Sequence, residues 1–140
     1  MNVTIEDGAI RDTEELTKLG KMYEQWTGKQ YNPNYSTNGS IFVVAKDNDS
    51  NNDNIVGCIQ LIIIEDPFFQ RKWGMLENLF VSPNYRKIGL GERLVERAEV
   101  VASDLECSFV KLTSNFDKVA SHALFKSRNY VEGGSFKRKL

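Results

Sequence analysis

The chain has 140 residues, of which 41% are hydrophobic and 26% are charged, and its formal net charge at pH 7 is −1. This length suffices for an ordinary core, so we expect a single domain over residues 1–140. The near-neutral charge argues against a nucleic-acid partner and against binding to an anionic membrane. The longest apolar run, around Leu61 to Ile64, has the length of a strand and not of a membrane span.

The cysteines and the first residues indicate the compartment. Cys58 and Cys107 each lie in an apolar, strand-like run, and we interpret them as reduced, buried thiols. Glu6 and Asp7 interrupt the start of the chain, so we expect no signal peptide. A cytoplasmic protein is therefore expected. We expect no metal site, because no His/Asp/Glu cluster has ligand spacing.

The N-terminal part predicts a strand, a helix and a loop. Alternation over residues 2–6 predicts a short strand, and the helix that follows has Asp12 or Thr13 as its N-cap. Residues 28–40 form a polar loop, which either lines an acceptor pocket or is a plain connection. The buried face of the helix is expected to consist of Leu16, Leu19, Met22, Tyr23 and Trp26.

Three apolar runs predict three consecutive strands, at residues 41–45, 55–64 and 73–81, and the second run is rich in β-branched residues. The connections between them are short, which favours an antiparallel meander. Gly57 in the second strand indicates a place where two backbones approach closely.

The C-terminal part predicts a crossover. Ser82-Pro83-Asn84 ends the third of these strands, and a helix follows whose apolar face contains Leu90, Leu94, Ala98, Val101, Ala102 and Leu105. Residues 108–113 then predict a parallel strand. Residues 114–118 lead into a helix ending near Arg128, with Asn129 in a left-handed cap. Residues 135–140 predict a last strand. The order β α β β β α β α β indicates an α/β fold, a mixed sheet flanked by helices.

The turn between residues 86 and 91 predicts an anion site. The first N–H groups of a helix lack intrahelical partners, and the helix dipole favours negative charge there. Gly89 and Gly91 allow a phosphate to approach the backbone, and Arg86 and Lys87 add positive charge. The dinucleotide fingerprint fails because Leu94 occupies the place of its third glycine, and no P-loop Gly-Lys-Ser/Thr is present. The remaining alternative is a tight connection without a ligand.

Arg86-x-x-Gly89-x-Gly91, after a strand ending at Val81 and a Ser-Pro-x-Tyr-Arg turn, resembles a known signature. It is the coenzyme A motif Arg/Gln-x-x-Gly-x-Gly/Ala of the GCN5-related N-acetyltransferase (GNAT) family. The order of elements resembles this family as well. Residues 111–130 and the ending Arg138-Lys139-Leu140 resemble one branch, the small aminoalkylphosphonate N-acetyltransferases. The resemblance implies the GNAT-like acyl-CoA N-acyltransferase fold.

The resemblance also implies where acetyl-CoA binds, in a V between the strand ending at Val81 and the strand ending at Thr113. Asn115 would orient the pantetheine, and Phe125 would lie near the thioester sulfur. The pantetheine would pair with the backbone of Leu79, Phe80 and Val81. Arg86 and Lys87 would contact phosphate, and the pyrophosphate would lie against the backbone N–H groups of Ile88, Gly89, Leu90, Gly91 and Glu92.

Glu77 is the candidate catalytic base. It is a carboxylate in an otherwise apolar strand, where burial would raise its pKa. It also resembles the strand glutamate that serves this role in several family members. The alternative is a structural Glu at an edge or in a salt bridge. Asn78 is expected to point to the opposite face, since side chains alternate along a strand.

The family often has Tyr at position 125, where the hydroxyl protonates the departing thiolate; this chain has Phe125. Tyr130 is the nearest phenol and is expected to pack against other residues. Protonation is therefore left to water or to another residue, and the low pKa of a thiol makes this loss less costly. His122, one turn before Phe125, is either a proton relay or a surface residue.

The leading hypothesis is an acetyl-CoA-dependent N-acetyltransferase acting on a small-molecule primary amine by direct attack in a ternary complex. A non-catalytic acyl-CoA-binding sensor, degenerate at Phe125, is the alternative. Glu65, Asp66 and the loop with Tyr31 and Tyr35 either bind a cationic acceptor or form a solvated surface. A homodimer through the terminal strands is compatible with the family.

Overall fold

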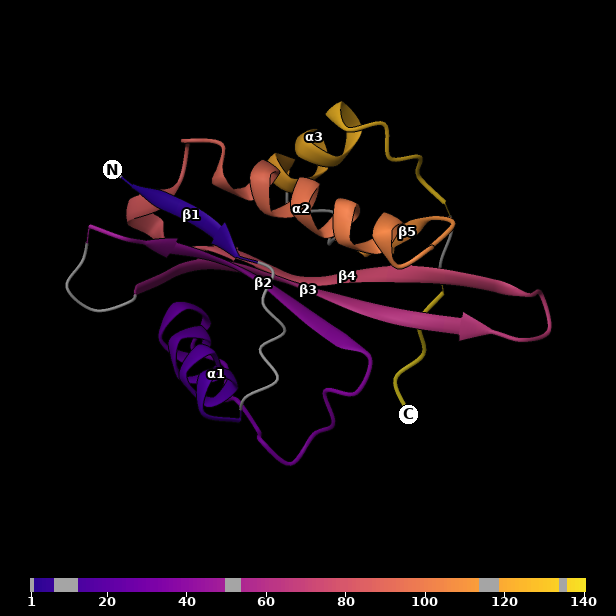
Figure 1. Cartoon of the computed structure of the whole chain (residues 1–140), viewed down its shortest axis with the longest axis horizontal. Helices are drawn as coiled ribbons and strands as arrows, with labels where there is room; N and C mark the ends of the chain where they lie inside the picture. The colour runs from indigo at the N-terminus through magenta and orange to yellow at the C-terminus, as the bar shows by residue number, and fades with distance from the viewer. Residues whose placement is uncertain (1, 7–12, 50–53, 114–118, 134–135) are drawn as a thin grey trace.

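The structure is a computed structural model that describes residues 2–6, 13–49, 54–113, 119–133 and 136–140 (Figure 1). Its elements agree with the expected order from the first strand to the last helix. They are β1 (Val3–Glu6), α1 (Thr13–Thr27), β2 (Ser40–Asp47), β3 (Asn54–Asp66), β4 (Arg71–Val81), the short 3-10 helix η1 (Pro83–Tyr85), α2 (Leu90–Asp104), β5 (Val110–Leu112) and α3 (Val119–Ser127). The expected cap at Asp12 lies outside the described residues.

The described strands form one mixed sheet in the order β1-β2-β3-β4-β5. The first four strands pair antiparallel, and β5 joins β4 in parallel after the crossover through α2. Helix α1 covers one face of the sheet, whereas α2 and α3 lie on the other (Figure 1). The predicted antiparallel meander and the mixed sheet flanked by helices are thus confirmed.

Both faces of the sheet carry apolar clusters. Under α1, buried Leu19 packs against Val44, Ile55 and Cys58, and Met22, Tyr23 and Trp26 lie at the margin. The α2 face is the larger core, and its buried members include Leu90, Leu94, Val95, Ala98, Ala102, Val43, Val56, Ile59 and Leu61. Leu105 was expected in this core, but it lies just past the end of α2 and is 36% exposed.

Gly57 lies where two backbones meet, as predicted. A Cβ atom placed there would be 3.0 Å from the carbonyl oxygen of Phe80 and 3.2 Å from Cδ1 of Leu94. The absent side chain therefore lets β3 lie close to β4 beneath α2.

The predicted last strand is wrong. Residues 136–140 form no strand, and Phe136 and Leu140 are fully exposed. A strand in a sheet buries alternate side chains against a neighbouring layer, and these apolar side chains have no such layer. The strand predicted at 108–113 is also shorter, since β5 contains only Val110–Leu112. Asn129 has φ 66°, which confirms its left-handed conformation.

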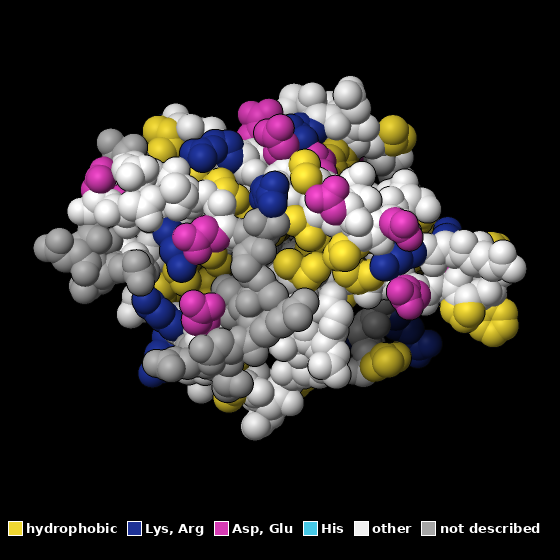
Figure 2. All heavy atoms as spheres, in the orientation of Figure 1, with side chains coloured by type: hydrophobic (Ala, Val, Ile, Leu, Met, Phe, Trp, Pro, Cys, Tyr) yellow, Lys and Arg dark blue, Asp and Glu magenta, His cyan; other side chains and the backbone are white. Residues whose placement is uncertain are grey.

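Acidic and basic side chains are interspersed over the face shown in Figure 2. Acidic and basic side chains of the protein also pair, for example Lys46 with Glu6 at 3.0 Å and Lys126 with Glu132 at 3.4 Å. A nucleic-acid-binding face typically gathers Lys and Arg into a patch or stripe. On the face shown in Figure 2, Lys and Arg are instead interspersed with Asp and Glu.

Candidate active site

The turn after β4 is shaped by two left-handed residues. Lys87 has φ 65° and Gly89 has φ 78°. A Cβ atom at Gly89 would meet nothing within 4 Å, so backbone conformation and not crowding favours glycine there. At Gly91, a Cβ would lie 3.9 Å from Cγ2 of Val81, an ordinary contact. The protein itself therefore leaves space beside the backbone of this turn.

Gly89 is the N-cap of α2, and it provides no side chain that could accept a hydrogen bond from the helix. The first bond across this end runs from the N–H of Arg93 to the carbonyl oxygen of Gly89, at 3.1 Å. The N–H groups of Leu90, Gly91 and Glu92 precede it and have no intrahelical acceptor. Together with the helix dipole, they make this end suited to an anion.

Arg86 lies across the end of β4. Its Nε donates a hydrogen bond of 2.9 Å to the carbonyl oxygen of Val81, and its guanidinium lies 5.3 Å from the ring centroid of Phe80. Arg86 therefore braces the turn against the strand. Its expected contact with phosphate, like that of exposed Lys87, stays a prediction.

The β4 and β5 strands part beside this turn. Their parallel pairing joins Gly74–Leu76 to Val110–Leu112 and goes no further among the described residues. Residues 77–81 of β4 continue past the end of β5. The pairing of β4 with β5 thus ends near the place expected for the V that would hold acetyl-CoA, and the V itself stays a prediction. Asn115 lies outside the described residues.

A β-bulge separates Glu77 from Phe80. Gln60 pairs with Glu77 and Cys58 pairs with Phe80, so two residues of β4 lie opposite Ile59 alone. One of the two is Asn78, whose φ of 54° lies in the left-handed region. The bulge offsets the usual alternation of side chains. It therefore brings Glu77 and Phe80 to the same face of the sheet, the one covered by α1.

The expectation that Asn78 points away from Glu77 is wrong. The Nδ2 of Asn78 donates a hydrogen bond of 2.8 Å to Oε1 of Gln60, and the hydroxyl of Tyr23 donates one of 2.9 Å to Oδ1 of Asn78. Both partners lie on the α1 face. Sequence reasoning missed Tyr23 and Gln60 as polar neighbours of Glu77. The available signal was an Asn inside an apolar strand, because Asn tolerates a left-handed backbone.

Glu77 itself is partly buried, and its neighbours are polar and aromatic. Burial and the charges of Cys58 and Glu77 raise the pKa of the Tyr23 phenol. The Phe80 ring stacks on Trp26 with centroids 4.8 Å apart. A carboxylate beside a neutral phenol and aromatic rings is an environment that can hold a primary amine and take up its proton.

Phe125 lies at the margin of the core on the α2 face, with its ring centroid 5.4 Å from that of Tyr130. The Tyr130 hydroxyl donates a hydrogen bond of 2.7 Å to Oε2 of Glu99. Burial and this carboxylate raise the pKa of Tyr130. The expectation that Tyr130 packs is confirmed, and its proton is held by Glu99. His122 is partly buried on α3.

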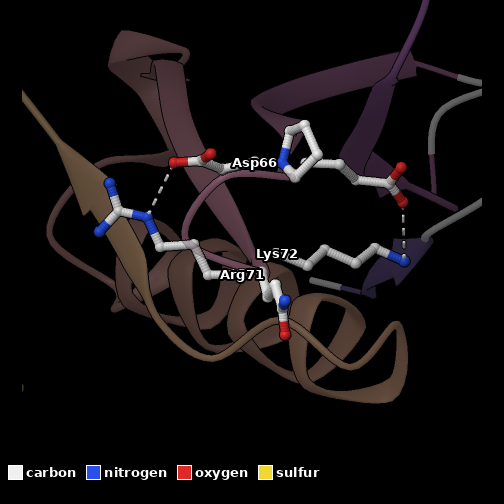
Figure 3. Close-up of a pocket in the computed structure, with 6 residues that line it drawn as sticks. Asp66, Arg71 and Lys72 are labelled. Atoms are coloured by element: carbon white, nitrogen blue, oxygen red, sulfur yellow. Dashed lines mark ion pairs between the residues drawn. The ribbon is translucent and has the colours of Figure 1, made fainter.

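A separate hollow of about 480 Å³ lies near the tip of the β3–β4 hairpin (Figure 3). Figure 1 shows this tip at the opposite end of the sheet from the Gly89 turn. Its charges are paired: Arg71 Nε lies 3.4 Å from Asp66 Oδ2, and Lys72 Nζ lies 3.7 Å from Glu65 Oε1. These ion pairs favour the solvated-surface interpretation of Glu65 and Asp66.

Within the part of the chain that the structure describes, no cluster of His, Cys, Asp or Glu could hold a metal ion. No described helix is long and apolar enough to cross a membrane.

Comparison with models of known protein families identifies the family of this chain. The sequence model described as "Acetyltransferase (GNAT) family" matches residues 9–130. The chain therefore belongs to the GNAT family of acetyltransferases, and the family resemblance is confirmed.

Particular relatives agree with this. The chain is 33% identical over 82 residues to N-acetyltransferase family 8 member 3 of Rattus norvegicus, covering 59% of this chain and 36% of that protein. It is 34% identical over 59 residues to aminoglycoside N(6')-acetyltransferase type 1 of Acinetobacter haemolyticus, covering 42% and 41%. The matches thus span less than half of these curated relatives.

A crystal structure of a Trypanosoma brucei acetyltransferase has the same fold. It superimposes with a TM-score of 0.75 at 18% identity and covers 99% of each chain. At this identity the likeness concerns the fold alone.

Proposed function

We propose that the protein is an acetyl-CoA-dependent N-acetyltransferase that acetylates a primary amine of a small molecule by direct attack in a ternary complex. The observation that carries this proposal is the position of the uncapped N-terminus of α2. It comes after η1 and a short turn, beyond the end of β4 that β5 does not pair with among the described residues. The similarity to a protein named as an aminoglycoside N-acetyltransferase supports a small-molecule acceptor.

In this proposal, the coenzyme lies between the α2 turn and the open edge of β4. The left-handed Gly89 and the unbonded N–H groups that follow it suit a pyrophosphate, because both the backbone and the dipole favour an anion there. The backbone of Leu79 to Val81 would pair with the pantetheine as a strand would. Arg86 and Lys87 would screen the phosphates, and a backbone N–H near Val81 would polarise the acetyl carbonyl.

Acetyl-CoA supplies a thioester whose carbonyl carbon bonds to the amine nitrogen while the carbon–sulfur bond breaks. Glu77 takes the proton of the incoming ammonium, directly or through water. Because Glu77 lies on the α1 face, the acceptor amine would bind on that side of the sheet, away from α2. The acceptor and acetyl-CoA would therefore approach from different sides. With Phe125 at the family's Tyr position, protonation of the thiolate falls to solvent.

The same proposal extends to the domain organisation, the compartment, the class of amine and the oligomeric state. Residues 1–140 form one N-acetyltransferase domain that acts in the cytoplasm, where its two free thiols, Cys58 and Cys107, remain reduced. The aminoalkylphosphonate branch supplies a first class of amines to test. A homodimer would use surfaces other than a C-terminal strand, which residues 136–140 do not form.

A second candidate is a non-catalytic acyl-CoA-binding domain. The specific observation in its favour is that Phe125 has no hydroxyl and that the nearby Tyr130 phenol already donates to Glu99. Both candidates require coenzyme binding, whereas only the enzyme releases thiol with an amine.

The site is tested by thermal unfolding with and without acetyl-CoA. A ligand that binds only the native state raises the midpoint. Gly89→Ala strains the turn at φ 78°, and Gly28→Ala is its matched control, with φ 71° at the end of α1 and nothing within 4 Å of the added Cβ. Both variants are destabilised by similar backbone strain. We expect the acetyl-CoA shift to persist in Gly28→Ala and to shrink in Gly89→Ala. No shift in the wild-type protein at millimolar coenzyme contradicts both candidate functions.

A further inference from the structure

A chain of polar side chains connects α1 to the strands beneath it. The Tyr23 hydroxyl donates to Oδ1 of Asn78 at 2.9 Å, and the Nδ2 of Asn78 donates to Oε1 of Gln60 at 2.8 Å. The Nε2 of Gln60 in turn donates to Oγ of Ser40 at 2.9 Å. Four elements, α1, β4, β3 and β2, are thereby joined through the side-chain amides of Asn78 and Gln60.

Asn78 also sets the shape of β4. Its left-handed φ of 54° forms the bulge, and its backbone carbonyl accepts a hydrogen bond from the Cys58 thiol at 3.5 Å. Asn tolerates this conformation better than most non-glycine residues, and the hydrogen bonds of its side chain favour it here. Here the side chain is held on both sides, by Tyr23 through Oδ1 and by Gln60 through Nδ2.

The bulge immediately follows Glu77 and immediately precedes the open edge of β4 at Leu79. A rotation of the Asn78 peptide would therefore move the carboxylate and the pantetheine edge together. Tyr23 is suited to prevent this rotation, because its ring also packs edge-on against Phe80, with centroids 6.3 Å apart. Its phenol stays protonated at neutral pH, since burial raises its pKa, so the hydroxyl remains a donor.

We propose that Tyr23 and Asn78 are positioning residues for acetyl transfer: their hydrogen bond holds the β4 bulge so that Glu77 faces the acceptor amine while the strand edge faces acetyl-CoA. This inference rests on the proposed function. It makes the seating of α1 on the sheet a condition for the chemical step, whereas the α2 turn that would hold the pyrophosphate does not depend on this hydrogen bond.

The test compares Tyr23→Phe, Asn78→Gly and the double variant. Tyr23→Phe keeps the ring against Phe80 and removes only the hydroxyl. Asn78→Gly keeps a residue that adopts a positive φ and removes the amide. Thr27→Val is the matched control, because the Thr27 hydroxyl bonds the carbonyl oxygen of Tyr23, within α1, at 2.8 Å.

The readouts are kcat, KM for acetyl-CoA and the thermal midpoint. We expect each single variant to lower kcat about tenfold or more, because small displacements of reacting groups have effects of up to roughly 100-fold. KM for acetyl-CoA should change by a smaller factor than kcat, because the pantetheine edge shifts but the α2 turn that would hold the pyrophosphate is untouched. The double variant should be no slower than the slower single variant, since both remove one shared bond. Thr27→Val should keep the wild-type kcat.

Three results overturn the inference while leaving the proposed function intact. They are an unchanged kcat in both single variants, a lower thermal midpoint without a change in kcat, and fully additive losses in the double variant. A wild-type protein that releases no thiol with any amine overturns the proposed function, and the positioning role with it.

Discussion

The phenol of Tyr85 donates a hydrogen bond of 2.5 Å to Oδ2 of Asp47 and joins the end of β2 to the turn that precedes α2. Asp47 is 8% exposed and also accepts the N–H of Asp49 at 2.9 Å. This contact anchors the short helix η1 from the side of the β2–β3 hairpin. It therefore helps to fix the start of the proposed coenzyme site.

Low pH should weaken the hydrogen bond between Tyr85 and Asp47. The Tyr85 hydroxyl and the Asp49 N–H lower the pKa of Asp47. A carboxyl whose pKa is lower in the folded state stabilises the fold above its unfolded pKa of about 4, and this stability is lost as pH falls through the folded pKa. Tyr85→Phe should lower the thermal midpoint at pH 7 and reduce its fall between about pH 4 and pH 2. Equal pH profiles for the variant and the wild type contradict this role.

The two cysteines should differ in reactivity. Burial raises the pKa of Cys58 to about 12, so only about 10⁻⁴ of it is thiolate at pH 8. Cys107 is partly exposed; burial raises its pKa as well, and the charge of Lys72 opposes only part of this rise. Iodoacetamide in native buffer should modify Cys107 first, as mass spectrometry can follow, and both thiols after denaturation. Equal native rates contradict the burial of Cys58.

Glu99 on α2 holds the segment after α3. It accepts hydrogen bonds from Tyr130 and from Arg128, and Arg128 also lies 3.6 Å from Glu92. Glu99→Ala leaves both donors without this acceptor and should cost about 1–3 kcal/mol in the free energy of unfolding. Tyr130→Phe, which keeps the ring, should cost about 1 kcal/mol. Urea denaturation measures both values.

Tyr35→Phe is the control for that series, since Tyr35 is 77% exposed. It should change the free energy of unfolding by less than about 0.5 kcal/mol. A Tyr130→Phe variant as stable as this control indicates that the bond to Glu99 contributes nothing.

Gly57 tests the close approach of β3 and β4. An added methyl group would meet the Phe80 carbonyl at 3.0 Å, and backbone yields less easily than a side chain. Gly57→Ala should destabilise the fold by about 1–3 kcal/mol, as overpacking typically does. The control is Gly133→Ala, whose Cβ would meet nothing within 4 Å. Similar midpoints in urea for the two variants contradict the tight contact.

Most of the fold follows from hydrophobic periodicity. Leu90, Leu94, Ala98 and Ala102 repeat at helical spacing and are buried together, and the β-branched runs of β2 and β3 form the centre of the sheet. The last strand could not be predicted in this way. Phe136 and Leu140 are separated by three basic residues, and only tertiary contacts decide whether such apolar side chains find a layer to cover them.

The part of the site that a local backbone motif defines could be predicted from the sequence. The part that depends on tertiary contacts could not. The glycine spacing located the turn and the uncapped end of α2. The face of Asn78 was mistaken because strand alternation assumes no bulge, and the side chain of Asn78 bonds Tyr23 and Gln60, which are distant in sequence. Likewise, nothing in the local sequence indicates that Arg86 returns to Val81.

The central claim is tested most directly by measuring thiol release from acetyl-CoA with a panel of small primary amines, for the wild type and for Glu77→Gln. We expect amine-dependent release by the wild type. We also expect a kcat lower by about 100-fold or more in Glu77→Gln, the usual cost of losing a general base. Acetyl-CoA binding by a protein that releases no thiol with any amine would contradict the enzymatic claim and favour the acyl-CoA-binding alternative.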